Sequence, residues 1–169
     1  LALTKEDEVR AAQYQAQSKR QAAKSSSASL DDYLHSLQIE IAIGPASREV
    51  LARLVQLFSK TNQFNLTTKR YQTDDVAGFM TSGSDIVYDL HVKDRFGDHG
   101  LVGAAVVRKE PRAWRIDSLL MSCRVMGLGI ETAFLERICA DAARAGITTV
   151  IGEFIATKKN QPVKEFYSR

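Results

Sequence analysis

Hydrophobic and polar residues begin to alternate at Gln38, in the string QIEIAIG. This period of two predicts a strand in which Ile39, Ile41 and Ile43 share one buried face, because successive side chains of a strand point to opposite faces. We therefore expect the main domain to begin at residue 38.

Apolar residues at spacings of three and four predict two amphipathic helices farther along the chain. The first begins at Ser47 and ends near Lys60, and the second covers residues 127–144. Gly146 stands just past the second helix, where glycine is a common C-cap residue. The two expected core faces consist of Val50, Leu51, Leu54, Val55 and Phe58 in the first helix and of Phe134, Leu135, Ile138, Cys139 and Ala142 in the second.

Runs typical of strands separate these helices and follow the second one. The order of all these elements predicts an α/β fold with a mixed, mostly antiparallel sheet flanked by helices. A short helix is expected near 73–80. An antiparallel meander is expected to follow, with strands at 85–92, 101–110 and 113–122 and a turn over 94–100. The chain is then expected to form a buried strand over 147–155 and to begin a last helix within 160–169.

The residues before the main domain predict a helical connector. Residues 4–23 are rich in Gln, Ala, Lys, Glu and Arg and predict a solvated helix, with Thr4 placed as its cap. The string KSSSAS, residues 24–29, interrupts this pattern and predicts a flexible joint, after which Ser29 is placed to cap a second helix. We interpret residues 1–37 as a helical linker that arrives from an upstream domain.

Composition narrows the classes of function. A chain of 169 residues with 44% hydrophobic and 25% charged residues is long enough for one globular domain with a real core. The net charge of +3 comes with scattered basic residues, which argues against a nucleic-acid partner but allows a locally basic site for a phosphorylated ligand. No apolar run of about 18 residues and no signal-peptide pattern occurs, so we expect a cytoplasmic protein that does not bind membranes.

The string MSCRVMGLGIE combines Arg124 with Gly127 and Gly129 where a strand is expected to meet the second long helix. The first N–H groups of a helix and the positive end of its dipole favour an anion, and glycine lets a phosphate approach the backbone closely. Arg124 adds a charge-assisted contact. The same glycines also suit a tight connection between strand and helix, so phosphate binding and plain packing remain alternatives.

The two cysteines, Cys123 and Cys139, lack the spacing of a zinc site and are expected to be free thiols, with no metal in this chain. Cys139 lies on the expected apolar helix face, so a core position is expected for it. Cys123 directly precedes Arg124 and the expected helix start, an environment that favours the thiolate. Because free cysteine also behaves as a small buried hydrophobe, catalysis and packing both stay open for Cys123.

Few side chains are candidates for a general base or a positioning group. His99 lies in the Gly-flanked turn, where a plain role in the turn is the alternative. Glu153 lies within an apolar strand, so its carboxylate needs hydrogen bonds, a charged partner or a function. Asn62 belongs to the polar loop TNQFN, which is either a simple turn or a group of side chains that orients a polyol or an amide.

The order of elements, the R-x-x-G-x-G pattern that opens the second long helix, and Asn160 six residues before the pair FY resemble the GNAT acyltransferases. In that family the pantetheine arm of the thioester pairs with a splayed central strand, and the pyrophosphate rests on the Gly-rich turn. A Tyr near the end often protonates the leaving thiolate. The resemblance gives Arg124, Gly127 and Gly129 the phosphate-binding role and makes Tyr167 the candidate acid.

Longer strings make the resemblance more specific. TNQFNLTTKRY, DRFGDHGLVG, MSCRVMGLGIE and GEFIATKKNQPVKEFY are similar to the C-terminal portion of FkbH-like proteins and cover most of the chain from Ile39 onwards. Such proteins join a haloacid-dehalogenase (HAD)-type phosphatase domain to a GNAT-like domain. They load a glyceryl unit from 1,3-bisphosphoglycerate onto an acyl carrier protein, often in polyketide biosynthesis.

The chain departs from the FkbH-like pattern in two ways. The Asp-x-Asp-x-Thr signature of the phosphatase is absent, and the sequence stops at FYSR, where the family pattern continues into a turn and a closing strand. We therefore interpret residues 38–169 as a GNAT-like acyltransferase domain, truncated at its C-terminus, that follows an upstream phosphatase domain.

The resemblance implies a cysteine mechanism. Cys123 would take the glyceryl group as a thioester and pass it to the phosphopantetheine arm of an acyl carrier protein. His99 is the first choice for the general base and Glu153 the second, while Asn62 positions the glyceryl hydroxyl or holds the oxyanion. Two alternatives stay open: a coenzyme A-dependent N-acyltransferase with direct transfer, which needs no cysteine, and a non-catalytic module that docks the carrier protein.

Overall fold

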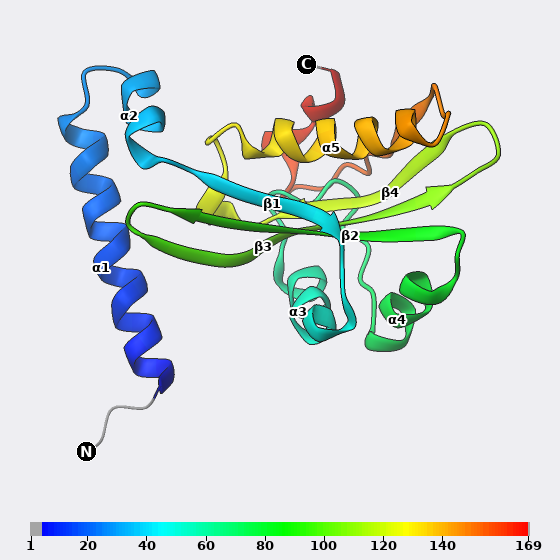
Figure 1. The fold of residues 1–169 in the computed structure, drawn as a ribbon, viewed down its shortest axis with the longest axis horizontal. Coiled ribbons are helices and arrows are strands. Elements are labelled where there is room, and N and C mark those ends of the chain that lie inside the picture. The colour runs from blue at the N-terminus through cyan, green and yellow to red at the C-terminus, as the bar shows by residue number, and fades with distance from the viewer. Residues whose placement is uncertain (1–4, 169) are drawn as a thin grey trace. The chain divides into compact units, whose positions relative to one another are not determined.

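The computed structural model describes residues 5–168 and contains one five-stranded sheet (Figure 1). The strands follow one another across the sheet in chain order. β3 and β4 are antiparallel, whereas β4 and β5 are parallel, so the expected mixed α/β architecture is confirmed. The strands are β1 (Glu40–Pro45), β2 (Asp85–Asp94), β3 (Gly97–Lys109), β4 (Trp114–Met121) and β5 (Val150–Gly152).

Contacts among the described residues divide them into two compact units. The first unit contains the described residues up to Ala42 together with His91–Gly100, the tip of the β2–β3 hairpin. The second unit contains Ile43–Leu90 and the described residues from Leu101 onward. The expected boundary between a linker and a main domain at residue 38 stays a prediction.

The long helix of the first unit, α1 (Lys5–Ser26), extends farther than the sequence predicts. The prediction of a flexible joint over 24–29 is wrong for its first three residues, because α1 continues through Ser25 and Ser26. Their hydroxyls donate to backbone carbonyls three or four residues earlier, which lets serine remain in a helix. The expected cap Thr4 lies outside the described residues.

The second helix, α2 (Leu30–Leu37), is capped by Ser29 as expected. The Ser29 hydroxyl accepts a hydrogen bond from the N–H of Asp32 at 3.1 Å. At the other end, the carbonyl of Leu37 accepts a hydrogen bond from the N–H of Arg95 at 2.9 Å. This bond joins α2 to the hairpin tip within the first unit.

Asp94 ties α1 to the same hairpin tip. The Nε and Nη2 of Arg20 donate to its two carboxylate oxygens at 2.7 and 3.0 Å, and Nε2 of His99 lies 3.0 Å from Oδ2. The N–H groups of Phe96 and Gly97 also donate to this carboxylate. Burial alone would raise the pKa of Asp94, but the hydrogen bonds outweigh burial and lower the pKa to about 2. His99 lies within β3, so the prediction that it belongs to the turn is wrong.

The buried isoleucine face expected for β1 is wrong. Ile41 is 41% exposed, and Ile43 is only partly buried. β1 is an edge strand with a neighbour on one side only, so its side chains have fewer neighbours than those of the inner strands β3 and β4.

Helices cover both faces of the sheet in the second unit (Figure 1). α3 (Leu51–Lys60) and α4 (Thr73–Thr81) lie against one face, and α5 (Ile130–Arg144) lies against the other. The sequence predicted α3 and α4 closely, although a 3₁₀ turn precedes α3. The buried core under α3 and α4 consists of Leu54, Leu57, Phe58, Val76, Val87, Leu101, Ala104, Val106 and Leu120.

α5 begins at Ile130, three residues later than the sequence predicts. Gly127 and Gly129 have φ values of 76° and 77°, which a right-handed helix does not contain. The core position expected for Cys139 is wrong, because this residue is exposed beside the buried stripe. Gly146, with φ of 77°, ends the helix as expected. The buried residues of α5 recur every four positions, at Ile130, Phe134, Ile138 and Ala142.

The end of the chain is less regular than expected. β5 covers only Val150–Gly152 of the predicted strand 147–155 and is not fully buried. The residues expected to begin a last helix form two 3₁₀ turns, Gln161–Val163 and Phe166–Ser168. None of the helices in residues 5–168 is long and apolar enough to cross a membrane.

Replacing Asp94 with Asn is expected to lower the free energy of unfolding by about 2 kcal/mol at neutral pH. The Asp94 side chain is 1% exposed, and the neutral amide loses its charge-assisted bonds with Arg20. Because the folded pKa lies below the ordinary value of 3.8, the carboxylate contributes fully above about pH 4 and loses this contribution as the pH falls toward 2.

Urea unfolding of Asp94→Asn and the wild type across this pH range measures the effect. Glu8→Gln, at an exposed position of α1, is the matched control. A difference between Asp94→Asn and the wild type that does not shrink below pH 4 would contradict the assignment.

Candidate functional site

The candidate site forms where β4 ends and a short 3₁₀ turn, Cys123–Val125, begins. Ser122 caps this turn, and its hydroxyl accepts a hydrogen bond from the N–H of Arg124 at 3.4 Å. Cys123 therefore stands at the start of the 3₁₀ turn, seven positions before Ile130, the first residue of α5. The expectation that Cys123 directly precedes the positive end of the long helix is wrong.

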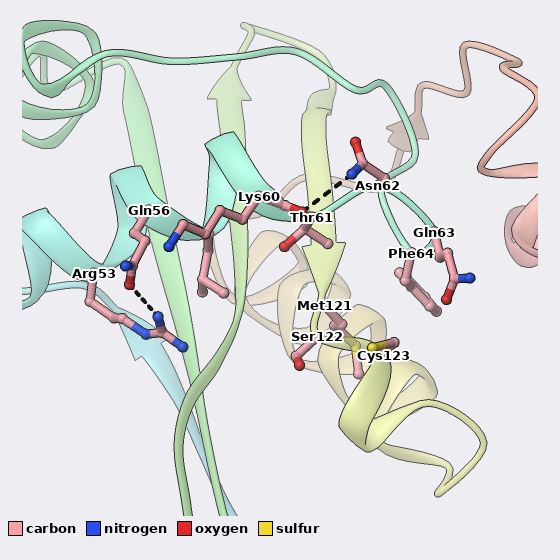
Figure 2. A pocket seen from close by; sticks show the side chains of 11 residues that line it. Arg53, Gln56, Lys60, Thr61, Asn62, Gln63, Phe64, Met121, Ser122 and Cys123 are labelled. Carbon is pink, nitrogen blue, oxygen red and sulfur yellow. Dashed lines mark hydrogen bonds between the residues drawn. The ribbon is translucent and has the colours of Figure 1, made fainter. Parts of the chain in front are cut away.

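A cavity of about 300 Å³ opens beside Cys123 (Figure 2). One wall consists of α3 and the loop that follows it, and the other consists of the end of β4. Asn62 and Cys123, which are far apart in the sequence, thus line the same space. The lining residues are Arg53, Gln56, Leu57, Lys60, Thr61, Asn62, Gln63, Phe64, Met121, Ser122 and Cys123.

The cavity is positively charged. Arg53 and Lys60 extend from α3, and Arg53 Nη1 donates to Oε1 of Gln56 within the lining (Figure 2). Among the described residues that line the cavity there is no Asp or Glu. Cys123 is an exposed residue on the opposite wall. An anionic ligand is therefore favoured next to an accessible thiol.

Arg70 and the chain around it hold Asn62 in place. Arg70 Nη2 donates to Oδ1 of Asn62, and Arg70 Nη1 donates to the carbonyl of Thr61 at 2.9 Å. Nδ2 of Asn62 donates to the carbonyl of Lys60 at 3.3 Å. An amide has two N–H donors, so the described contacts leave one of them for a ligand oxygen.

Arg124, Gly127 and Gly129 follow the cavity in the sequence but do not line it. A Cβ at either glycine would meet no described atom within 4 Å, so the backbone there is open to a ligand. Gly129 offers no side chain to the first N–H groups of α5, and Arg124 Nε lies 3.3 Å from the hydroxyl of Ser122. Glu131 in the first turn of α5 already places a carboxylate near these groups. The open glycine backbone fits a phosphate, and its binding there stays a prediction.

Glu153 lies one residue past β5, within an ion-pair network. Its Oε2 is 3.0 Å from Nζ of Lys69, and the same ammonium is 2.7 Å from Oδ1 of Asp117. Tyr71 also donates to Asp117, and Nε of Arg108 lies 3.3 Å from it. Burial opposes ionisation of Asp117, but the hydrogen bonds from Lys69 and Tyr71 outweigh it and lower the pKa of this carboxyl. Lys69 thus supplies a charged partner for Oε2 of Glu153, and the role of Glu153 as a base stays a prediction.

His99 and Tyr167 are outside the set of residues that line the cavity. The His99 side chain is 5% exposed, belongs to the first unit and is held by Asp94. The Tyr167 ring lies so close to Gly152 that a Cβ there would be 2.6 Å from it. Its hydroxyl is buried without a partner among the described residues, and burial raises the pKa of this phenol above its ordinary value of 10.0. Both proposed roles, base and acid, stay predictions.

The site predicted from the sequence did not include Arg53, Gln56 and Lys60. Their spacings of three and four place them on one face of α3, and this polar stripe just before TNQFN was the signal that would have identified them. In the part of the chain that the structure describes, no three or more His, Cys, Asp and Glu side chains gather in a way that would hold a metal ion.

Replacing Gly129 with Ala is expected to lower the free energy of unfolding by about 1 kcal/mol, because a φ of 77° is strained for a residue with a Cβ. Gly44→Ala is the matched control, since a Cβ there also meets no described atom within 4 Å and the φ of Gly44 is not in the left-handed region. The measurement is urea unfolding of both variants. Equal midpoints for the two would contradict the prediction.

Comparisons with known proteins give a fold. No protein-family model matches the sequence, and no curated protein sequence matches it. Ribosomal-protein-S18-alanine N-acetyltransferase from Escherichia coli aligns over 76% of this chain and 75% of its own, with 12% identity and a TM-score of 0.58. Glucosamine-6-phosphate N-acetyltransferase from Arabidopsis thaliana aligns over 76% and 88%, with 15% identity and a TM-score of 0.54. A predicted acetyltransferase with acetyl-CoA from Clostridium acetobutylicum aligns over 77% and 90%, with 14% identity and a TM-score of 0.52. This chain therefore has the GNAT-like acetyltransferase fold.

Proposed function

We propose that the protein is an acyltransferase that carries a glyceryl group on Cys123. The group would come from 1,3-bisphosphoglycerate and pass to the phosphopantetheine arm of an acyl carrier protein, as the similarity to FkbH-like proteins implies. The observation that carries the proposal is the exposed thiol of Cys123 on one wall of a cavity whose other wall holds Arg53 and Lys60.

The cavity suits an acyl phosphate as the donor. Such a donor brings two features together, a negatively charged phosphate and a carbonyl open to attack. Arg53 and Lys60 supply positive charge for the phosphates, and the described lining contains no carboxylate that would repel them. An uncharged acyl donor would make no use of these two cations.

The chemistry requires two exchanges at one carbonyl carbon. The Cys123 thiolate attacks the carbonyl of the acyl phosphate, the C–S bond forms, the C–O bond to phosphate breaks, and inorganic phosphate leaves. The product is a 3-phosphoglyceryl thioester, and water must hydrolyse its C3 phosphate ester to give the glyceryl group. The thiol proton passes to a base or to solvent. The pantetheine thiolate then attacks the new thioester, and Cys123 leaves as a thiolate. Each exchange needs stabilisation of an oxyanion, and the Asn62 N–H that makes no described hydrogen bond would give it.

The other residues predicted from the sequence receive roles in this scheme because their side chains or backbones have the required chemistry. Arg124, Gly127 and Gly129 would hold the pantetheine phosphate, His99 or Glu153 would act as base, and Tyr167 would act as acid. An upstream phosphatase domain of the HAD type would hydrolyse the C3 phosphate ester, which converts the phosphoglyceryl group into the glyceryl group.

Direct transfer from coenzyme A to an amine is the second candidate function. The likeness in fold to solved structures of N-acetyltransferases favours it. Such a reaction needs no cysteine, so the two candidates differ in the fate of Cys123.

Intact-protein mass spectrometry after incubation with 1,3-bisphosphoglycerate tests the cysteine mechanism. We expect a 3-phosphoglyceryl adduct on the wild type and its loss in Cys123→Ala, because Cys123 supplies the only thiol among the described lining residues. Cys139→Ala removes the other exposed cysteine and is the matched control, which should keep the adduct. An adduct that persists in Cys123→Ala, or acetylation of an amine from acetyl-coenzyme A by that variant, would exclude the proposed mechanism.

Replacing Arg53 with Gln or Lys60 with Ala is expected to raise the donor concentration needed for half-maximal adduct formation by about tenfold or more, because a charge-assisted hydrogen bond contributes about 1.5–3 kcal/mol. The rate at saturating donor should change less. Arg48→Ala removes an exposed cation that does not line the cavity and is the control. Equal effects of all three substitutions would mean that only the overall charge matters.

A further inference from the structure

The last three residues of β4 pair with a segment other than β5. β4 and β5 are paired only from Trp114 opposite Val150 to Ile116 opposite Gly152. β3 occupies the other edge of β4 along its whole length. Beyond Ile116, the edge of β4 that faces β5 is no longer paired with β5. Its backbone groups therefore need hydrogen-bond partners from another segment.

Residues 64–66 supply these partners. The N–H of Leu66 donates to the carbonyl of Leu119 at 3.1 Å, and the N–H of Met121 donates to the carbonyl of Phe64 at 2.9 Å. On the outer side of the segment, the N–H of Ile155 donates to the carbonyl of Leu66 at 2.8 Å. The segment thus lies as a short strand between β4 and the chain that follows β5.

Two buried asparagines hold the segment. Nδ2 of Asn160 donates to the carbonyls of Asn65 and Ile155, both at 2.9 Å. Asn65 donates to the carbonyl of Thr61 at 3.1 Å and accepts from the N–H of Thr68 at 2.8 Å. Both asparagine residues are 0% exposed, and the segment itself is no more than 3% exposed. It is therefore buried and hydrogen-bonded on both sides.

We propose that residues 64–66 are a built-in strand that closes the β4 edge to the extended pantetheine arm of coenzyme A thioesters. An arm that paired through its amides with this part of the β4 edge would use the carbonyl of Leu119 and the N–H of Met121, and both are already bonded within the chain. Displacing the segment would break these bonds and the bond from Ile155, and would expose Phe64 and Leu66 to water. Each such loss costs about 1 kcal/mol or more, so a weakly bound arm does not displace it.

The closed edge has a consequence for the acceptor, which rests on the proposed function. The thiol of a carrier protein would reach Cys123 through the cavity beside α3 and not along β4. Asn62, Phe64 and Met121 line that cavity.

Amide hydrogen exchange of the wild type, followed by NMR with and without millimolar acetyl-coenzyme A, tests the closed edge. Slow exchange at Leu66 and Met121 that acetyl-coenzyme A leaves unchanged is the expected result. Faster exchange at Leu66 on addition of acetyl-coenzyme A would mean that the arm displaces the segment, and would overturn the proposal. The same measurement on Cys123→Ala should give the same answer, so failure of the proposed cysteine chemistry stays distinguishable.

The variant Asn160→Asp tests whether the segment is what excludes the arm. It retains the side-chain oxygen that accepts from the N–H of Thr157 but loses both N–H donors. We expect exchange at Leu66 and Ile155 to accelerate by about tenfold or more, since two hydrogen bonds are lost. Acetyl-coenzyme A should then slow exchange at Met121 in this variant only.

Gln161→Ala is the matched control, because Gln161 bonds the carbonyl of Thr157 and makes no described bond to the segment. If Asn160→Asp frees the segment and acetyl-coenzyme A still leaves Met121 unchanged, another feature excludes the arm and the proposal is wrong. Should Asn160→Asp fail to fold, the wild-type measurement decides alone.

Discussion

β4 has to find hydrogen-bond partners along both of its edges, and the candidate site depends on how it does so. β5 pairs with the first part of β4 only, and residues 64–66 pair with the rest. Residues 64–66 belong to the loop that follows α3, and Asn62 stands two positions before them in this loop. Pairing of this loop with β4 therefore brings Asn62 to the same cavity as Cys123. The cavity is thus a consequence of strand pairing and not of side-chain packing alone.

Charge is distributed in a way that keeps the cavity cationic. Two carboxylates that are buried outside the cavity have basic partners of their own: Asp117 contacts Lys69 and Arg108, and Asp94 contacts Arg20. Arg53 instead bonds the neutral amide of Gln56, beside the cavity. An anion that enters therefore meets positive charge that carboxylates of the lining have not neutralised.

A shared fold leaves the chemistry open, because a fold provides a scaffold on which different sites are built. The GNAT-like sheet of this chain opens where β4 and β5 separate, yet the opening is occupied by the chain itself. A thiol at the end of β4 and two cations on α3 stand beside it. These local features, and not the fold, separate a cysteine mechanism from direct transfer.

The sequence alone determined the element order, the α3 and α4 helices, the hairpin and the cap Ser29, because these follow from local periodicity and local hydrogen bonds. It also identified Cys123 and Asn62 as candidates. Tertiary structure decided the rest: Cys139 is exposed, Ile41 lies on an edge strand, and Glu153 is ion-paired with Lys69. Burial and partners depend on which segments meet in space, and no pattern within one element records that. The pairing of residues 64–66 with β4 is the clearest case, because hydrogen bonds between segments more than 50 positions apart leave no local period in the sequence.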